Sequence, residues 1–127
     1  MNRAVLDASA VLALLRRETG AEKVDAVIPN AVIATVNLGE VLGKLVDYGM
    51  PETEGFSAVA GLGIGFVDVD VGLARVSAKL REATRKAGLS LGDRVCLALG
   101  ERLELPVLTS DRSWGQLDLA QEVHLIR

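Results

Sequence analysis

A short apolar stretch that ends on a carboxylate limits most strongly what this chain can fold into. Ala4-Val-Leu6 has no polar alternation, which predicts a strand buried on both faces inside a parallel sheet. Asp7 follows, and a helix rich in Ala and Leu begins at once, with Ser9 placed to cap it. In open α/β sheets, ligands bind outside the carboxyl ends of the strands. Asp7 therefore stands either at a binding crevice or at the cap of the helix.

The rest of the chain alternates strand and helix signals without a linker or a repeat, which is typical of a parallel sheet with helical crossovers. We expect the other strands at 31–34, 66–69, 105–109 and 123–126. The remaining helices are expected over 21–27, from a cap at Asn37 to Tyr48, over 51–62, from a cap at Asp70 over 71–87, and from a cap at Ser90 over 91–103.

Length and composition indicate one domain, residues 1–127, in a reducing compartment. A chain of 127 residues is long enough to form one core that folds unaided. Cys96 is the only cysteine, so the sequence offers neither a disulfide framework nor a thiolate metal site. We find no secretory signal and no uncharged apolar stretch of the ~20 residues that a membrane span needs. A cytoplasmic location away from membranes is expected.

The charge balance restricts how the protein could bind a nucleic acid. The net charge of −3 and the isoelectric point near 5.1 argue against binding through a mainly basic surface. Aromatic residues are only 3%, so platforms for stacking bases are scarce. Hydrophobic residues reach 50% with a mean hydropathy of +0.32, and we expect a partner to cover part of that apolar surface.

Three further acids, Glu40, Asp93 and Asp111, occupy positions like that of Asp7, at a strand end or in the first turns of a helix. Each alone fits a capping role, because Asn-x-x-Glu and Ser-x-x-Asp resemble capping boxes. Together they lie on the rim where parallel sheets place their sites. Four like charges there would repel and raise some pKa values unless a cation held them. Carboxylates without His or Cys companions favour Mg²⁺ or Mn²⁺, which can bind a phosphodiester and activate water.

Four motifs occur in one order along the chain: Val5-Leu-Asp7-Ala-Ser9, Val36-Asn-Leu-Gly-Glu40, Leu89-Ser-Leu-Gly-Asp93-Arg-Val-Cys-Leu-Ala98 and Thr109-Ser-Asp111-Arg-Ser-Trp114. With them the chain resembles the PIN-domain ribonucleases, specifically the VapC-type toxins of type II toxin–antitoxin pairs. The resemblance implies a three-layer α/β/α PIN-like domain whose parallel five-stranded sheet has the order 3-2-1-4-5. It also implies an endoribonuclease that hydrolyses RNA phosphodiester bonds with Mg²⁺ or Mn²⁺.

The resemblance assigns roles to particular residues and partners. The catalytic and metal-binding quartet would be Asp7, Glu40, Asp93 and Asp111, and the supporting hydrogen-bond donors would be Ser9 with Thr109 or Ser110. Arg94 and Arg112, each beside a site acid, are candidates for contact with RNA. A homodimer and a VapB-like antitoxin are implied as partners. The helices over 37–48 and 51–62 are the expected contact surface.

Two other classes of α/β protein were weighed. A receiver-like module needs an acidic pair after its first strand and a lysine after a late strand, and neither Asp7-Ala-Ser9 nor Leu108-Thr-Ser-Asp111 supplies these. A non-catalytic interaction module would need none of the four acids. Substitution of single acids separates that alternative from a nuclease.

Overall fold

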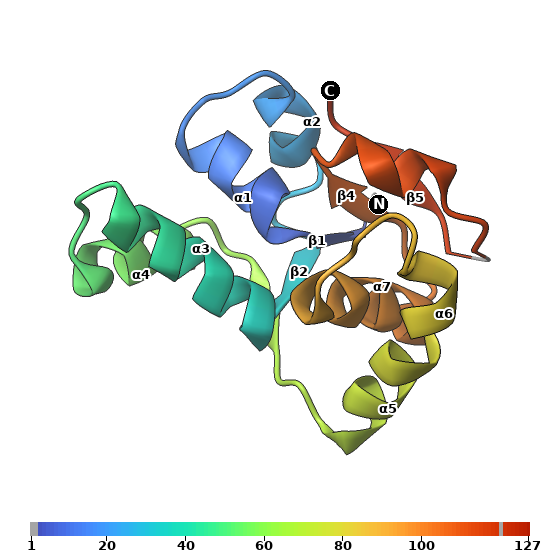
Figure 1. The fold of residues 1–127 in the computed structure, drawn as a ribbon. Helices are drawn as coiled ribbons and strands as arrows, with labels where there is room; N and C mark the ends of the chain where they lie inside the picture. The colour runs from blue at the N-terminus through green and yellow to red at the C-terminus, as the bar shows by residue number, and fades with distance from the viewer. Residues whose placement is uncertain (1–2, 120) are drawn as a thin grey trace.

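A parallel five-stranded sheet forms the centre of the computed structural model, which describes residues 3–119 and 121–127 (Figure 1). Its strands are β1 (Ala4–Leu6), β2 (Ala31–Ala34), β3 (Gly65–Val67), β4 (Val107–Thr109) and β5 (Val123–Leu125). Their spatial order is β3-β2-β1-β4-β5, which confirms the predicted 3-2-1-4-5. Because every neighbouring pair is parallel, the carboxyl ends of the strands share one rim.

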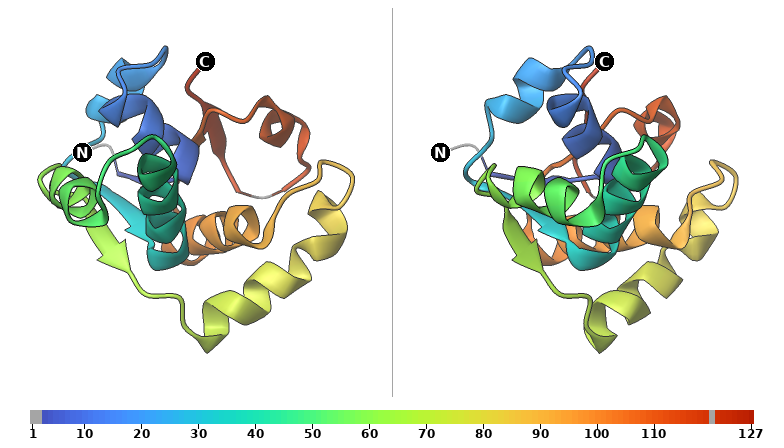
Figure 2. Two further views of the ribbon diagram at one scale, coloured as in Figure 1. Left: turned by 60° about the vertical axis from the view of Figure 1, so that its left-hand side comes forward. Right: turned by 90° about the vertical axis from the view of Figure 1, so that its left-hand side faces the viewer.

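Helices cover both faces of this sheet, so the domain has the predicted three layers (Figures 1 and 2). They are α1 (Ala8–Leu15), α2 (Ala21–Asp25), α3 (Thr35–Asp47), α4 (Glu52–Ala60), α5 (Val71–Lys79), α6 (Arg81–Thr84) and α7 (Leu91–Leu103), followed by the 3-10 helix η1 (Arg112–Gln116). In the part of the chain described, no helix combines the length and the apolarity that crossing a membrane requires.

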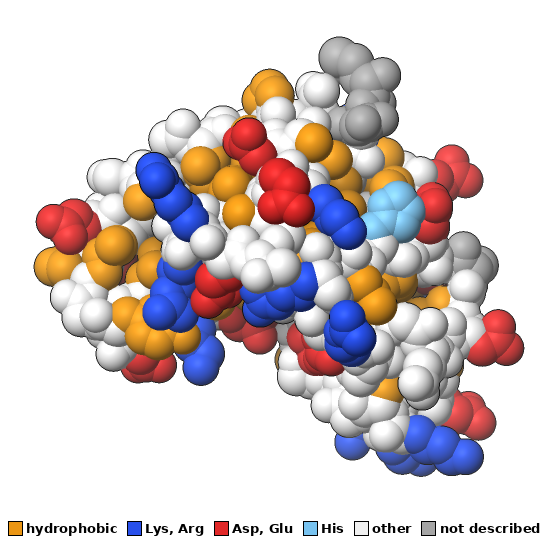
Figure 3. All heavy atoms as spheres, turned by 90° about the horizontal axis from the view of Figure 1, so that it is seen from above, with side chains coloured by type: hydrophobic (Ala, Val, Ile, Leu, Met, Phe, Trp, Pro, Cys, Tyr) orange, Lys and Arg blue, Asp and Glu red, His pale blue; other side chains and the backbone are white. Residues whose placement is uncertain are grey.

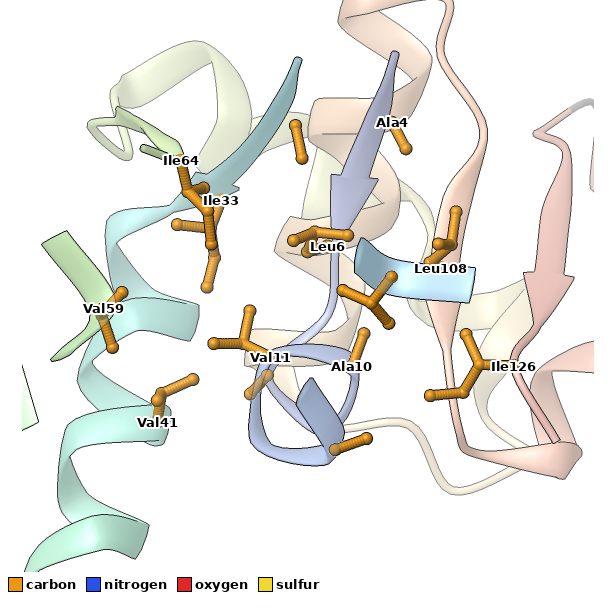
Figure 4. Close-up of a cluster of buried hydrophobic side chains, with 14 of the residues drawn as sticks. Ala4, Leu6, Ala10, Val11, Ile33, Val41, Val59, Ile64, Leu108 and Ile126 are labelled. Atoms are coloured by element: carbon orange, nitrogen blue, oxygen red, sulfur yellow. The ribbon is translucent and has the colours of Figure 1, made fainter. Parts of the chain in front are cut away.

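Strand β1 lies between the two hydrophobic clusters of the core. Ala4 and Leu6 pack into a cluster with α1 to α4, whereas Val5 faces a second cluster with α5 and α7. All three side chains are fully buried, which confirms the prediction of a strand covered on both faces. Figure 4 shows the first cluster, in which Leu6 lies between Ile33 of β2 and Leu108 of β4, with Val11 of α1 below it. β1 thus holds Asp7, the next residue, at a fixed point on the rim.

Two predicted caps are wrong, and both residues do something else. Helix α3 begins at Thr35, so Asn37 lies inside the helix rather than at its cap, and its side chain is buried. Helix α1 begins at Ala8, and the Ser9 side chain binds Asp7 rather than a backbone N–H of the first turn. In each case a tertiary partner holds the side chain that a free helix would have used for capping.

The predicted helix over 71–87 is also wrong, because it is interrupted after Lys79. The chain turns at Leu80, and the short helix α6 that follows ends at Thr84, ahead of Gly88 with its φ of +71°. The predicted caps of the flanking helices are confirmed. Asp70 accepts from the Leu73 N–H at 2.8 Å, and Ser90 begins α7.

Candidate active site

Strand pairing brings Asp7 and Thr109 together on the rim. Leu6 of β1 pairs with Leu108 of β4, and the Asp7 N–H donates to the Leu108 carbonyl at 3.0 Å. The next residue of β4, Thr109, therefore lies beside Asp7 and donates its hydroxyl to Asp7 Oδ2 at 2.9 Å. Ser9 donates to the same oxygen at 2.7 Å. The register of two neighbouring strands thus contributes one of the two hydroxyl donors to this carboxylate oxygen.

Asp7 is a buried carboxylate without a basic partner. Its side chain is 5% exposed, and no Lys, Arg or His among residues 3–119 and 121–127 forms an ion pair with it. Burial raises the pKa of Asp7 from 3.8 to about 6, against the lowering effect of the Ser9 and Thr109 hydroxyls, and the charge of Asp93 raises it further. A carboxylate in this state gains most from a bound cation.

Glu40 reaches the rim from α3 and lies against the first turn of α7. Its Oε1 accepts from Asn37 Nδ2 at 2.8 Å, and the same nitrogen donates to the Gly92 carbonyl at 3.0 Å. A Cβ atom on Gly92 would lie 2.5 Å from Glu40 Oε2. Gly92 therefore leaves the room that the Glu40 carboxylate occupies, a role that the sequence analysis missed.

Asp93 is held in a capping box at the start of α7. Its Oδ2 accepts from the Ser90 N–H at 2.9 Å, and its own N–H donates to the Ser90 hydroxyl at 3.2 Å. The capping role considered for Asp93 is therefore present. Burial raises the pKa of the Cys96 thiol on α7, and the charges of Asp7, Asp93 and Glu40 raise it further. Because Glu40 lies against Gly92, the residue before Asp93, both of these acids meet the first turn of α7.

Asp111 is the outermost of the four acids. Its Oδ1 accepts from the backbone N–H of Ser113 at 3.0 Å and from the Ser113 hydroxyl at 2.8 Å, so it caps η1 as considered. Its N–H donates to the Thr109 hydroxyl at 3.1 Å, and the Ser110 N–H donates to the Ser9 hydroxyl at 3.0 Å. Thr109 supports the site through its side chain, whereas Ser110 does so through its backbone.

The four acids lie along the rim, but their side chains do not form a complete metal-binding site. Within the ranges 3–119 and 121–127, no three His, Cys, Asp or Glu side chains converge closely enough to hold one ion. Glu40, Asp93 and Asp111 are each bound to a neighbour on their own element. An oxygen-only set around a buried, uncompensated Asp7 still fits a hard divalent ion, because Mg²⁺ keeps several waters and uses one or two carboxylates directly.

The two arginines beside the acids have different surroundings. Arg94 turns toward α5, where its Nη1 donates to the Ser77 carbonyl at 3.0 Å. Arg112 is exposed at the start of η1. Contact of either arginine with RNA stays a prediction. Basic and acidic side chains are interspersed over the face seen from above Figure 1, without an extended basic surface there (Figure 3).

A parallel sheet of this order with carboxylates along its carboxyl rim defines a class of protein, the α/β domains that place an acidic site at the strand ends. The PIN domain family matches residues 4–119, and the chain belongs to that family. PIN domains are typically nucleases, and the family's nucleases use divalent metals. No curated protein matches the chain.

Solved structures of toxin–antitoxin complexes share the fold over nearly the whole chain. A toxin–antitoxin complex from Klebsiella pneumoniae matches with 19% identity and a TM-score of 0.75, covering 98% of each chain. DNA-bound VapBC from Salmonella typhimurium matches with 15% identity and a TM-score of 0.72, covering 100% of each chain. VapBC-5 from Mycobacterium tuberculosis is 26% identical with a TM-score of 0.65, covering 100% of this chain and 99% of that one. The resemblance to VapC-type proteins is thereby confirmed.

Proposed function

We propose that this protein is a metal-dependent endoribonuclease that acts as the toxin of a VapBC-like toxin–antitoxin pair. The observation that carries the proposal is the buried Asp7 carboxylate, which pairs with no basic side chain of the described residues. It lies on a rim shared with three further acids. A site that excludes cationic side chains from a buried carboxylate is suited to an exogenous cation. The family membership and the toxin–antitoxin neighbours support the same conclusion.

Each acid of the site, and each hydroxyl that contacts Asp7, has a proposed role. Asp7, Asp93 and Glu40 would hold the cation, Mg²⁺ or Mn²⁺, directly or through water. Such a cation lowers the pKa of water and stabilises charge on a phosphodiester. Ser9 and Thr109 orient Asp7 and favour its ionised form. Asp111, exposed at the rim, would position the attacking water or a second ion.

A cleavage assay tests the proposal. The purified protein should cut single-stranded or structured RNA with Mg²⁺ or Mn²⁺, and EDTA should abolish the activity. Asp7→Asn should be inactive with an unchanged circular dichroism spectrum, whereas Asp47→Asn, an exposed acid at the far end of α3, should keep full activity. Full cleavage in EDTA, or by the Asp7→Asn protein, would exclude this mechanism. No cleavage of RNA with either metal would favour a non-catalytic interaction module.

We also propose an antitoxin partner and a homodimer, supported by apolar surface on α3 and α4. Three large side chains there are exposed, Val46 at 49%, Tyr48 at 55% and Phe56 at 41%. Gly39 and Gly43 are exposed on α3 with open space above each α carbon, so another helix could approach closely. Co-purification with the product of a neighbouring small reading frame tests the antitoxin assignment.

A further inference from the structure

The buried side-chain amide of Asn37 connects α3 and α7, the helices that carry Glu40 and Asp93. Asn37 is 0% exposed, and the two hydrogens of its Nδ2 serve Glu40 Oε1 on α3 and the Gly92 carbonyl on α7. These helices pack in different core clusters, on opposite faces of the sheet, and meet only near the rim (Figure 1). The Asn37 amide therefore lies where the two halves of the site come together.

The chemistry of its partners fixes which way the amide points. Both partners are oxygen acceptors, so only the NH₂ group can face them. The other end of the amide, Oδ1, is buried and accepts no hydrogen bond from any described residue. A buried acceptor left unpaired is destabilising. This destabilising group lies in the same amide that holds the Glu40 carboxylate in position.

Gly92 also contacts the Glu40 carboxylate. A Cβ atom on Gly92 would lie 2.5 Å from Glu40 Oε2 and 2.9 Å from Oε1, too close for a methyl group unless the carboxylate moved. Asn37 pulls one oxygen of Glu40 toward α7, and the absence of a side chain at Gly92 lets it come close. The next residue along the chain is Asp93, so this contact brings the acid from α3 to the turn that carries the acid from α7.

We propose that Asn37 is a positioning residue, which clamps α3 onto the first turn of α7 and thereby holds Glu40 beside Asp93 in the geometry that binds the cation. This inference rests on the proposed function. Cation binding should therefore weaken in both of two cases: when Asn37 loses its N–H donor, and when a methyl group at Gly92 displaces the Glu40 carboxylate.

The experiment measures Mn²⁺ affinity by calorimetry on metal-free protein, without RNA. Asn37→Ala removes the donor, Asn37→Asp replaces it with an oxygen of the same shape, and Gly92→Ala pushes Glu40 away while leaving both acids and the amide intact. Each should weaken Mn²⁺ binding by roughly 10- to 100-fold, the range for partners that orient metal ligands. Leu91→Ala is the matched control, because Leu91 lies in the same turn of α7 and is exposed.

Steady-state kinetics supply the second measurement. At saturating Mn²⁺ the variants should show a lower kcat and an unchanged KM for RNA, since Asn37 is buried and does not touch substrate. Because a smaller folded fraction would also lower the apparent kcat at an unchanged KM, the rates are compared at equal concentrations of folded protein. If Asn37→Ala fails to fold, Gly92→Ala decides, because the atom that must move is the end of a flexible side chain.

The outcomes separate the two claims. A wild-type protein that binds no Mn²⁺ would overturn the proposed function and this inference together. Wild-type binding with unchanged affinity in Gly92→Ala or in Asn37→Asp would overturn the inference alone. Loss of affinity in these variants, with Leu91→Ala like the wild type, is the result we expect.

Discussion

Thr109, the last residue of β4, donates its hydroxyl to Oδ2 of Asp7, the first residue after β1, at 2.9 Å. The two residues are neighbours only because the strands pair in register, with Leu6 beside Leu108. The same hydroxyl oxygen accepts from the N–H of Asp111. One buried side chain therefore connects the innermost acid of the site with the outermost.

Replacing this hydroxyl should destabilise the protein. Thr109→Val keeps the shape but removes one of the two hydroxyl donors to the buried Asp7 carboxylate and leaves the Asp111 N–H without its partner. The free energy of unfolding should therefore fall by about 1–3 kcal/mol. The pKa of Asp7 should rise further, because a donor that favours its ionised form is gone. Urea denaturation measures the loss, and Thr53→Val, exposed on α4, is the control. Equal destabilisation of both variants would show that the contact contributes nothing.

Asp7→Asn should stabilise the metal-free protein near neutral pH. A shift in the pKa of Asp7 from 3.8 unfolded to about 6 folded corresponds to about 3 kcal/mol, which ionisation of the buried group takes from the folded state. Below pH 3.8 both states are protonated and this penalty is absent. The penalty grows as pH rises from 3.8 toward 6 and is complete above that value. The stability advantage of Asp7→Asn should follow the same course.

Denaturation of both proteins in EDTA at about pH 4, 6 and 8 checks this course. The two stabilities should be closest at the acid end and diverge through the folded pKa of Asp7. A constant difference across the series would mean that Asp7 has the same pKa folded and unfolded.

The Asp70–Arg102 pair should contribute modestly and in a salt-dependent manner. Arg102 donates to both oxygens of Asp70 at 2.8 Å each, which joins the start of α5 to α7. Arg102 holds the pKa of Asp70 well below its usual value, so this contribution is present at neutral pH and fades as pH falls below 3.8. Arg102→Met should lower the Tm at low salt, and concentrated NaCl should shrink the difference. An equal loss at both salt concentrations would point to packing instead.

Val46→Asp should shift the proposed dimer toward monomer. A charge on this half-exposed apolar residue of α3 would be buried against the second copy. Sedimentation at tens of micromolar, on the order of ordinary dimer affinities, measures the change. Lys44→Asp places the same charge on an exposed polar position of α3 and should matter less. A wild-type protein that sediments as a monomer would end the dimer proposal.

The features that could be predicted from the sequence are those that depend on residues close together in the chain. Ala4-Val-Leu6 indicates a strand buried on both faces, and Ser90 with Asp93 indicates a capping box, because each signal lies within a few residues. Asn37 was misassigned because Asn-x-x-Glu also fits a cap. The spacing was informative in another way, since residues three apart share a helix face. Its second partner, Gly92, is distant in sequence and belongs to another helix.

The upward direction of the pKa shift at Asp7 agrees with the sequence-based prediction, but its main cause does not. Repulsion among four acids was expected to raise pKa values, yet burial is the largest cause at Asp7 and the charge of Asp93 is a smaller one. The reason lies in the fold, because β1 is central and fully buried and carries its next residue into the interior. The sequence identifies which groups are charged, whereas their desolvation depends on layers that pack from distant segments.

The most direct test of a cation site centred on Asp7 is a pair of thermal melts across a Mg²⁺ titration, for the wild type and for Asp7→Asn. In EDTA the variant should melt higher, since it lacks the buried charge. Added Mg²⁺ should raise the wild-type Tm, with a gain of about 2.7 kcal/mol at a hundred times Kd, and should leave the variant nearly unchanged, so that the curves converge or cross. Parallel curves for the two proteins would contradict the account.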